Sequence, residues 1–204
     1  MSSFLQRFLD NITIPPATSW LLGSCMEARG KQTLWLRTTP EVLKALRDVA
    51  VIQSSESSNR IEGVTVDEKR LLPLLSRKVT PRDRSEEEVF GYKKALDWIH
   101  AKHDSIEITP RTIKKLHKIS QSGFSGDAGE WKKRNNEIIE ILPNGRRQVR
   151  FIPVLPEDTP QAIEDLCLAY KDLKGGGALP DLLGIAAFIL DFLCIHPFRD
   201  GNGR

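Results

Sequence analysis

The sequence predicts a mainly α-helical fold with one β-hairpin. Apolar residues recur at helical spacing through most of the 204-residue chain. A threonine stands directly before a proline at Thr109-Pro110 and Thr159-Pro160, which is typical of helix starts. Asn144-Gly145 lies between two short runs rich in β-branched residues, which is a hairpin signal. A composition of 40% hydrophobic and 28% charged residues is ordinary for a globular domain.

In the first half of the chain, periodicity is weak before residue 39, so no element is predicted there. Thr39-Pro40 predicts a helix with apolar positions up to Ala50, followed by a serine-rich stretch and a helix stop at Gly63. Thr65 and Ser85 are each followed by a glutamate three residues later, so both are predicted to cap a helix. Pro73 is expected to kink or end the first of these helices.

In the second half, a helix is expected from Thr109-Pro110 to near Gly123. The runs 137–142 and 148–153 form the expected hairpin. Helices then follow from Thr159-Pro160 and over Pro180–Ile195. The last of these is strongly apolar and is predicted to be buried.

Composition narrows the class of protein. A net charge of +3 and a pI near 8.8 do not indicate nucleic-acid binding. Cys25, Cys167 and Cys194 form neither a metal-ligand pair nor an even disulfide set, which favours a reducing, cytoplasmic location. No signal peptide is visible, and the longest apolar stretch, 182–195, is too short to cross a bilayer, so no membrane partner is expected.

The most informative segment is His196–Arg204, H-P-F-R-D-G-N-G-R. A histidine can accept a proton from a hydroxyl near neutral pH. The Asp200 carboxylate suits Mg²⁺ shared with substrate phosphates. Gly201 and Gly203 allow main-chain N–H groups to approach an anion, and Arg204 would neutralise its charge.

This segment resembles the signature of the Fic/Doc family, H-P-F-x-[D/E]-G-N-G-R-x-x-R, up to its first arginine. The second arginine would lie three residues beyond Arg204, so we expect the C-terminal end of the core to be missing. The resemblance implies a Fic-type helical bundle with one β-hairpin flap. It divides the chain into an N-terminal helical region, residues 1–84, and a Fic core, residues 85–204.

The resemblance also implies an activity: protein adenylyltransfer, in which AMP passes from ATP to a Ser, Thr or Tyr hydroxyl of a target protein or of the enzyme itself. His196 would be the catalytic base and Asp200 the ligand of Mg²⁺. The nucleotide would be bound by Gly201, Asn202, Gly203 and Arg204.

Two further segments gain a role from this resemblance. Ser58-Asn59-Arg60-Ile61-Glu62-Gly63 matches the family's inhibitory motif [S/T]-x-x-x-E-[G/N], with Ser58, Glu62 and Gly63 in the motif positions. Glu62 would repel the γ-phosphate and restrain the reaction. The first hairpin strand would be a flap that positions the target by main-chain pairing; its residues are Glu137, Ile138, Ile139, Glu140, Ile141 and Leu142.

Other hypotheses stay open. The same site could remove AMP by hydrolysis, with Glu62 orienting water, or bind nucleotide without turnover as a regulatory module. The phosphotransferase activity of the Doc branch fits less well, because that branch usually has lysine at the position of Gly203. A zinc hydrolase is disfavoured because His100, His103 and His117 have no zinc-ligand spacing and are expected to be exposed helix residues. A homodimer is neither required nor excluded.

Overall fold

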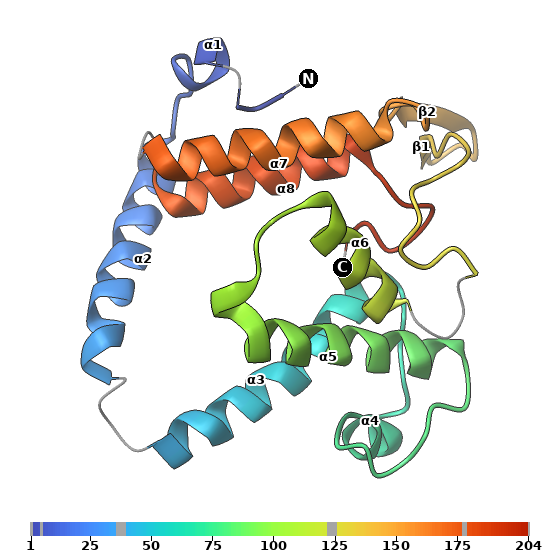
Figure 1. Ribbon diagram of the computed structural model, residues 1–204. Coiled ribbons are helices and arrows are strands. Elements are labelled where there is room, and N and C mark those ends of the chain that lie inside the picture. Colours follow the sequence, from blue (N-terminus) through green and yellow to red (C-terminus); the bar gives the residue numbers. More distant parts are fainter. Residues whose placement is uncertain (1, 5, 36–39, 122–125, 177–178, 204) are drawn as a thin grey trace.

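The computed structural model describes residues 2–4, 6–35, 40–121, 126–176 and 179–203 (Figure 1). It is mainly helical and contains one antiparallel hairpin, as predicted. In chain order the elements are α1 (Gln6–Leu9), α2 (Pro16–Trp35), α3 (Pro40–Ile61), α4 (Glu68–Leu75), α5 (Arg84–Lys102), the 3₁₀ turn η1 (His103–Ser105), α6 (Pro110–Ser120), β1 (Ile138–Ile141), β2 (Arg147–Phe151), α7 (Thr159–Gly176) and α8 (Asp181–Ile195).

The helices form two layers that meet near the C-terminal loop (Figure 1). Helices α7 and α8 lie side by side in one layer, and α5 packs against α3 and α6 in the other. Helix α2 runs along one side of the molecule and leads from α1 towards the start of α3. The last described residues, up to 203, lie between the layers (Figure 1).

Two apolar clusters hold this arrangement together. The larger joins α6, α7 and α8 to the C-terminal loop through residues that are each less than one-tenth exposed: Ile113, Ile163, Leu166, Cys167, Ile195 and Phe198. The smaller joins α4 to α5 through Leu71, Leu75 and Val89. Phe198 belongs to the larger cluster, so the hydrophobic core itself fixes the loop that carries the candidate site.

The buried carboxylate of Asp191 interrupts the apolar run of α8. It accepts hydrogen bonds from the main-chain N and the Oγ of Ser3, at 2.7 and 2.6 Å. A buried carboxylate must be hydrogen-bonded to be tolerated, so this contact attaches the start of the chain to α8.

The N-terminal half differs from the sequence prediction in two places. Helix α2 was not predicted, because its apolar residues show no periodic face. Much of its surface is exposed, including Trp20, Leu21 and Met26. Helix α3 continues through the serine-rich stretch to Ile61. Gly63 does end it: the residue has φ +78°, and its N–H donates to the carbonyl of Arg60. The predicted cap Thr39 lies outside the described residues.

Two predicted helix caps are wrong. Asp67, not Thr65, caps α4, and Asp83, not Ser85, caps α5; each aspartate accepts a main-chain N–H of the first turn. An aspartate stands two residues away from each predicted cap and competes with it as an equally good capping group. Pro73 lies inside α4 and does not end it. Thr109 caps α6 as predicted, and α6 ends at Ser120, whereas Gly123 lies outside the described residues.

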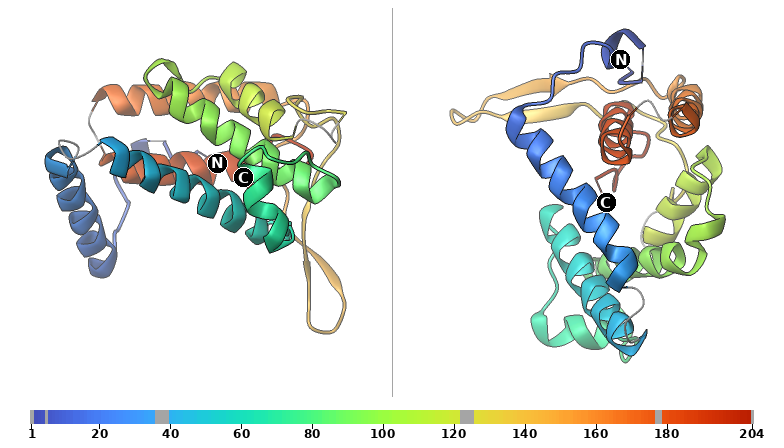
Figure 2. Two further views of the ribbon diagram at one scale, coloured as in Figure 1. Left: turned by 90° about the horizontal axis from the view of Figure 1, so that it is seen from below. Right: turned by 90° about the vertical axis from the view of Figure 1, so that its left-hand side faces the viewer.

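The hairpin forms where the Asn144-Gly145 signal placed it. Gly145 has φ +79° in the turn, and the two strands are slightly shorter than the predicted runs. Every residue of both strands is exposed. Figure 2 shows why: the hairpin projects away from the helices like a finger.

Within the part of the chain that the structure describes, we find no helix that is both long enough and apolar enough to span a membrane.

Candidate active site

The candidate base, His196, is the residue that ends α8. Its main chain is left-handed, with φ 51° and ψ 60°, and its N–H donates to the Phe192 carbonyl at 2.9 Å. A left-handed conformation is unfavourable for a residue with a Cβ atom, so surrounding contacts must hold it. The turn redirects the chain out of the helix into residues 196–203, which we call the His196 loop.

The loop is braced internally by Asn202. This buried side chain accepts from the N–H of Phe198 and donates to its carbonyl, at 2.8 and 2.9 Å. These two bonds engage both ends of the Asn202 amide in holding the loop. Gly201, with φ +75°, and the exposed Gly203 flank it. Arg204 lies outside the described residues.

His117 supports the loop from below, and the prediction that it is exposed is wrong. It is 7% exposed and its ring stacks on Phe198, with centroids 3.7 Å apart. The Gly129 N–H donates to its Nδ1 at 2.8 Å, so the ring proton is on Nε2, which donates to the Asp200 carbonyl at 3.0 Å. The helical pattern of α6 does not reveal this role, because the partners come from distant segments. His100 and His103 are exposed, as predicted.

The Asp200 carboxylate is on the loop surface. Its Oδ1 accepts from the Gly201 N–H at 2.8 Å, and its Oδ2 accepts from Nη2 of Arg84, the first residue of α5, at 3.1 Å. No group of three or more His, Cys, Asp or Glu residues in the described ranges could hold a metal alone. A single exposed carboxylate does fit Mg²⁺ that is coordinated mainly by phosphates and water.

The half-buried ring of His196 is a neutral base at physiological pH. Burial lowers its pKa from 6.5, and the charge of Lys132 adds to this effect. The Leu193 carbonyl and the carboxylates of Glu62 and Asp200 act in the opposite direction. Its Nδ1 is buried and has no well-formed hydrogen bond among the described residues, so Nε2 is the nitrogen available to a hydroxyl.

The structure brings Glu62 from the far end of α3 to the loop. Its Oε1 occupies the space that a Cβ atom on residue 203 would need, so the carboxylate lies directly against Gly203. Ser58 lies one turn earlier on α3 and accepts a 3.0 Å hydrogen bond from the Tyr92 hydroxyl of α5. Of the motif residues, Glu62 is therefore the one that the structure places against the His196 loop, although more than 130 positions separate them in the sequence.

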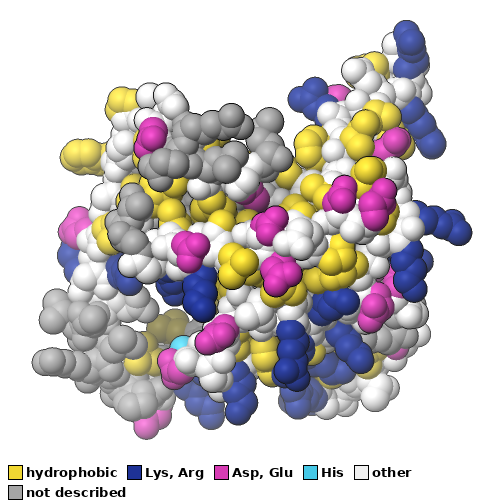
Figure 3. Space-filling view, turned by 45° about the horizontal axis from the view of Figure 1, so that its top comes forward, with side chains coloured by type: hydrophobic (Ala, Val, Ile, Leu, Met, Phe, Trp, Pro, Cys, Tyr) yellow, Lys and Arg dark blue, Asp and Glu magenta, His cyan; other side chains and the backbone are white. Residues whose placement is uncertain are grey.

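The predicted flap is attached to the loop at its root. Asn136, two residues before β1, donates to the carbonyls of His196 and Phe198. Beyond this root the strand edge is exposed, and Figure 3 shows basic side chains at the outer end of the lobe that projects at the upper right. The hairpin carries Arg146, Arg147 and Arg150 on its exposed surface.

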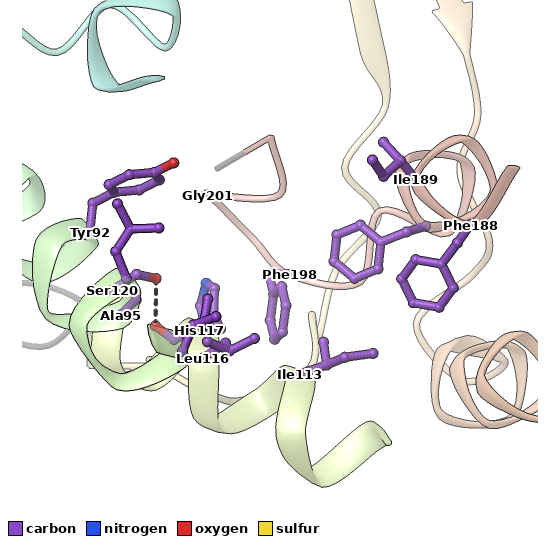
Figure 4. Close-up of a pocket in the computed structure, with 13 residues that line it drawn as sticks. Tyr92, Ala95, Ile113, Leu116, His117, Ser120, Phe188, Ile189, Phe198 and Gly201 are labelled. Atoms are coloured by element: carbon purple, nitrogen blue, oxygen red, sulfur yellow. Dashed lines mark hydrogen bonds between the residues drawn. The ribbon is translucent and has the colours of Figure 1, made fainter. Parts of the chain in front are cut away.

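An apolar pocket of about 310 Å³ lies on the core side of the loop (Figure 4). Tyr92, Ile113, Phe188 and Phe198 line it, and Gly201 is at its edge. Such a lining offers few partners for phosphate, so we place the candidate phosphate-binding surface at Asp200 and Gly203, which do not line the pocket.

Besides His117, the sequence alone did not reveal these residues of the site: Arg84, Tyr92, Lys132 and Asn136. Only Lys132 carried a signal, because Gly129-Glu130-Trp131-Lys132 resembles the segment that leads into a Fic flap. The other three have ordinary positions in the pattern, and only the fold brings them to the loop.

Comparisons with known proteins agree with this geometry. Residues 107–204 match the family model described as Fic/DOC family. A Fic domain containing signaling protein from Bacteroides thetaiotaomicron VPI-5482 is 25% identical, with a TM-score of 0.75 over 88% of this chain and 67% of that one. A Fic family protein from Desulfovibrio desulfuricans G20 is 22% identical, with a TM-score of 0.73 over 95% of this chain and 55% of that one.

A curated protein also matches in part. The ribonucleoside-diphosphate reductase small chain of Ostreid herpesvirus 1 (isolate France) is 28% identical over 132 residues, which are 60% of this chain and 22% of that protein. This chain spans so small a share of that protein that the match does not indicate a shared activity.

The fold and the His196 loop define a protein of the Fic type, and the family match and the two solved structures agree. The chain carries a Fic domain over residues 107–204.

Proposed function

We propose that this protein is an adenylyltransferase that moves AMP from ATP to a protein hydroxyl. One observation carries the proposal: a single short loop presents a neutral histidine, a carboxylate suited to Mg²⁺ and a glycine-rich main chain. Phosphoryl-type transfers depend mainly on positioning and on electrostatic stabilisation, and this loop offers groups for both.

In the proposed reaction, Nε2 of His196 accepts the proton of a Ser, Thr or Tyr hydroxyl. The hydroxyl oxygen forms a bond to the α-phosphorus of ATP, and the bond from that phosphorus to the bridging oxygen breaks. Pyrophosphate leaves with the electron pair. The main-chain N–H groups of Asn202 and Gly203, together with Arg204, bind the phosphates, and Gly201, whose N–H donates to Asp200, lets the main chain approach them closely. Mg²⁺ held by Asp200 would offset the charge of the α- and β-phosphates.

The exposed hairpin edge gives the target a place to bind. An extended segment of the target would pair with the main chain of 137–142, which fixes its register without requiring a particular sequence. The target hydroxyl would then be held near His196, because the hairpin root is hydrogen-bonded to the loop. The target is thus a protein, and we propose a reducing, cytoplasmic setting in keeping with three free cysteines.

Glu62 is proposed to restrain the reaction. Its carboxylate lies against Gly203, beside the surface where the phosphates would bind. A negative charge there repels the γ-phosphate, so that ATP binds with its α-phosphate poorly aligned for attack. Removing the carboxylate is expected to release the activity.

The test is intact-mass analysis after incubation with ATP and Mg²⁺. Glu62→Gly is expected to gain the mass of one or more AMP groups, whereas the matched variant Glu107→Gly, at an exposed loop glutamate, is expected to behave like the unmodified protein. Adding His196→Ala to Glu62→Gly is expected to abolish the gain. Retained labelling in the double variant would remove His196 as the base, and equal labelling of all variants would remove the inhibitory role of Glu62.

The position of Glu62 also favours a second candidate, hydrolytic removal of AMP. A carboxylate this close to the loop could orient a water molecule instead of only excluding the γ-phosphate. Incubating an AMP-modified target with the protein distinguishes the two, because hydrolysis predicts AMP release that requires Glu62, whereas transfer alone predicts none.

A further inference from the structure

The main chain around His196 is held by two side chains that come from the root of the hairpin. Lys132 Nζ donates to the Ile195 carbonyl at 3.0 Å, and the Lys132 N–H donates to the Pro197 carbonyl at 2.8 Å. Asn136 Nδ2 donates to the His196 and Phe198 carbonyls, at 3.2 and 2.9 Å. Four consecutive carbonyls, 195 to 198, are therefore satisfied by one short segment.

These two residues, which we call the anchor pair, also bind each other. Lys132 Nζ donates to Asn136 Oδ1 at 2.9 Å, which orients the amide so that its NH₂ group faces the loop. Lys132 is 5% exposed, and burial lowers its pKa to about 8. The carbonyls gathered at the C-terminal end of α8 favour a cation at this position.

This position matters because His196 is left-handed and ends a helix. The last carbonyls of a helix lack partners within it, and a residue with a Cβ atom does not keep φ near +51° without support. The anchor pair satisfies those carbonyls on both sides of the turn. The direction of the imidazole depends on this turn, since the ring is carried by the same residue.

We propose that Lys132 and Asn136 are positioning residues that hold the main chain of residues 195–198 and so set the direction of the His196 ring. The proposal rests on the proposed role of His196 as the base. It also couples the hairpin to that base, because the segment that leads into β1 is the segment that fixes the turn.

The first test compares Lys132→Met with Lys133→Met, its exposed neighbour. NMR titration of the His196 ring in the full chain measures its pKa. The charged groups that influence this ring are Lys132, Glu62 and Asp200. Removing the cation is expected to raise the His196 pKa, whereas Lys133→Met is expected to leave it unchanged. Lys132→Arg keeps the charge and is expected to restore the pKa of the unmodified protein at least in part.

The second test compares Asn136→Asp with Asn135→Asp, which adds the same charge at an exposed position. The carboxylate has no N–H to donate, so the His196 carbonyl loses its donor and the Phe198 carbonyl keeps only that of Asn202. In a background that carries Glu62→Gly, kcat for AMP transfer is expected to fall about 100-fold, the order expected for a misplaced catalytic group, with the KM for ATP little changed. The Asn135 variant is expected to stay within about twofold.

The outcomes separate this proposal from the proposed function. An unchanged His196 pKa in folded Lys132→Met would overturn the positioning role of the anchor pair. Equal kcat for the two aspartate variants would overturn it as well. If Lys132→Met does not fold, the asparagine comparison decides. If the chain transfers no AMP at all, the NMR amide signals of His196 and Phe198 decide: a shift in Asn136→Asp but not in Asn135→Asp supports the anchor pair, and no shift overturns it.

Discussion

At the scale of single residues, the environment of His196 is expected to set the pH range of the proposed reaction. Burial lowers its pKa below 6.5, so the ring is already neutral at pH 7. We expect kcat/KM of Glu62→Gly to be level from pH 7 to pH 8 and to decline as pH falls through the lowered pKa. A pH–rate profile measures this directly. A decline that begins above pH 7 would contradict a buried, neutral base.

Arg84 and Asp200 allow a second prediction at this scale. The 3.1 Å ion pair between them occupies one oxygen of the only carboxylate in the described part of the loop. Arg84→Ala is expected to tighten Mn²⁺ binding in the presence of a non-hydrolysable ATP analogue by about two- to fivefold, because an exposed ion pair is weak but does compete for that oxygen. Electron paramagnetic resonance of free Mn²⁺ measures this. Arg77→Ala, which breaks an ion pair remote from the loop, is the control, and equal affinities in both variants would argue against Asp200 as the ligand.

At the scale of elements, the contact between α5 and α6 depends on Gly91. A Cβ atom there would collide with the main-chain carbonyl of Ser120, which cannot move aside as a side chain can. Gly91→Ala is expected to lower the free energy of unfolding by about 1–3 kcal/mol. Gly23→Ala is the matched control, because Gly23 has open space around it on α2, and alanine there is expected to add up to ~1 kcal/mol. Urea unfolding measures both; a neutral Gly91→Ala would contradict the close approach of α5 to α6.

The junction of α4 and α5 is held by a buried ion pair. Glu86 accepts from Arg70 Nε and Nη2 at 2.5 and 2.8 Å and from the Arg82 N–H at 3.0 Å. These contacts lower the pKa of Glu86 from 4.5 to about 2, and the hydrogen bond from Arg70 makes the largest contribution. A lowered folded-state pKa means that the pair stabilises the fold fully above pH 4.5 and loses this effect as pH falls towards 2.

Glu86→Gln should therefore destabilise the protein by about 2–4 kcal/mol at pH 7 and by much less near pH 2. Thermal unfolding at several pH values tests this. A difference between the two proteins that does not shrink with acid would mean that Glu86 acts through its shape and volume and not through its charge.

Elements with local signals were predictable from the sequence, and those defined by tertiary contacts were not. The Thr109-Pro110 cap and the Asn144-Gly145 turn depend on contacts among a few neighbouring residues, so both were predicted at the correct positions. Helix α2 has no buried stripe and gave no periodic signal. The same division holds in the site: the His196 loop is a contiguous motif, whereas Lys132 and His117 reach it only because the chain folds back on itself.

At the scale of the whole molecule, the fold brings distant segments to the loop that follows α8. The end of α3 brings Glu62, the hairpin root brings Lys132 and Asn136, and α8 carries His196 itself. Ser3 attaches the start of the chain to Asp191 of the same helix. Restraint, target positioning and catalysis are thus proposed to act on one turn of the main chain, so a change in any segment is expected to be felt at His196.

The central claim is that AMP is transferred to a protein hydroxyl with His196 as the base. It is tested most directly by finding which phosphate of ATP becomes bound to the protein. Glu62→Gly is incubated with Mg²⁺ and with ATP labelled with ³²P at either the α- or the γ-phosphate. The account predicts protein-bound label from α-labelled ATP only, and none when His196→Ala is added. Label from γ-labelled ATP would indicate transfer of phosphate. Label from neither is the result expected of a protein that binds nucleotide without turnover. Either result would contradict the proposed transfer of AMP.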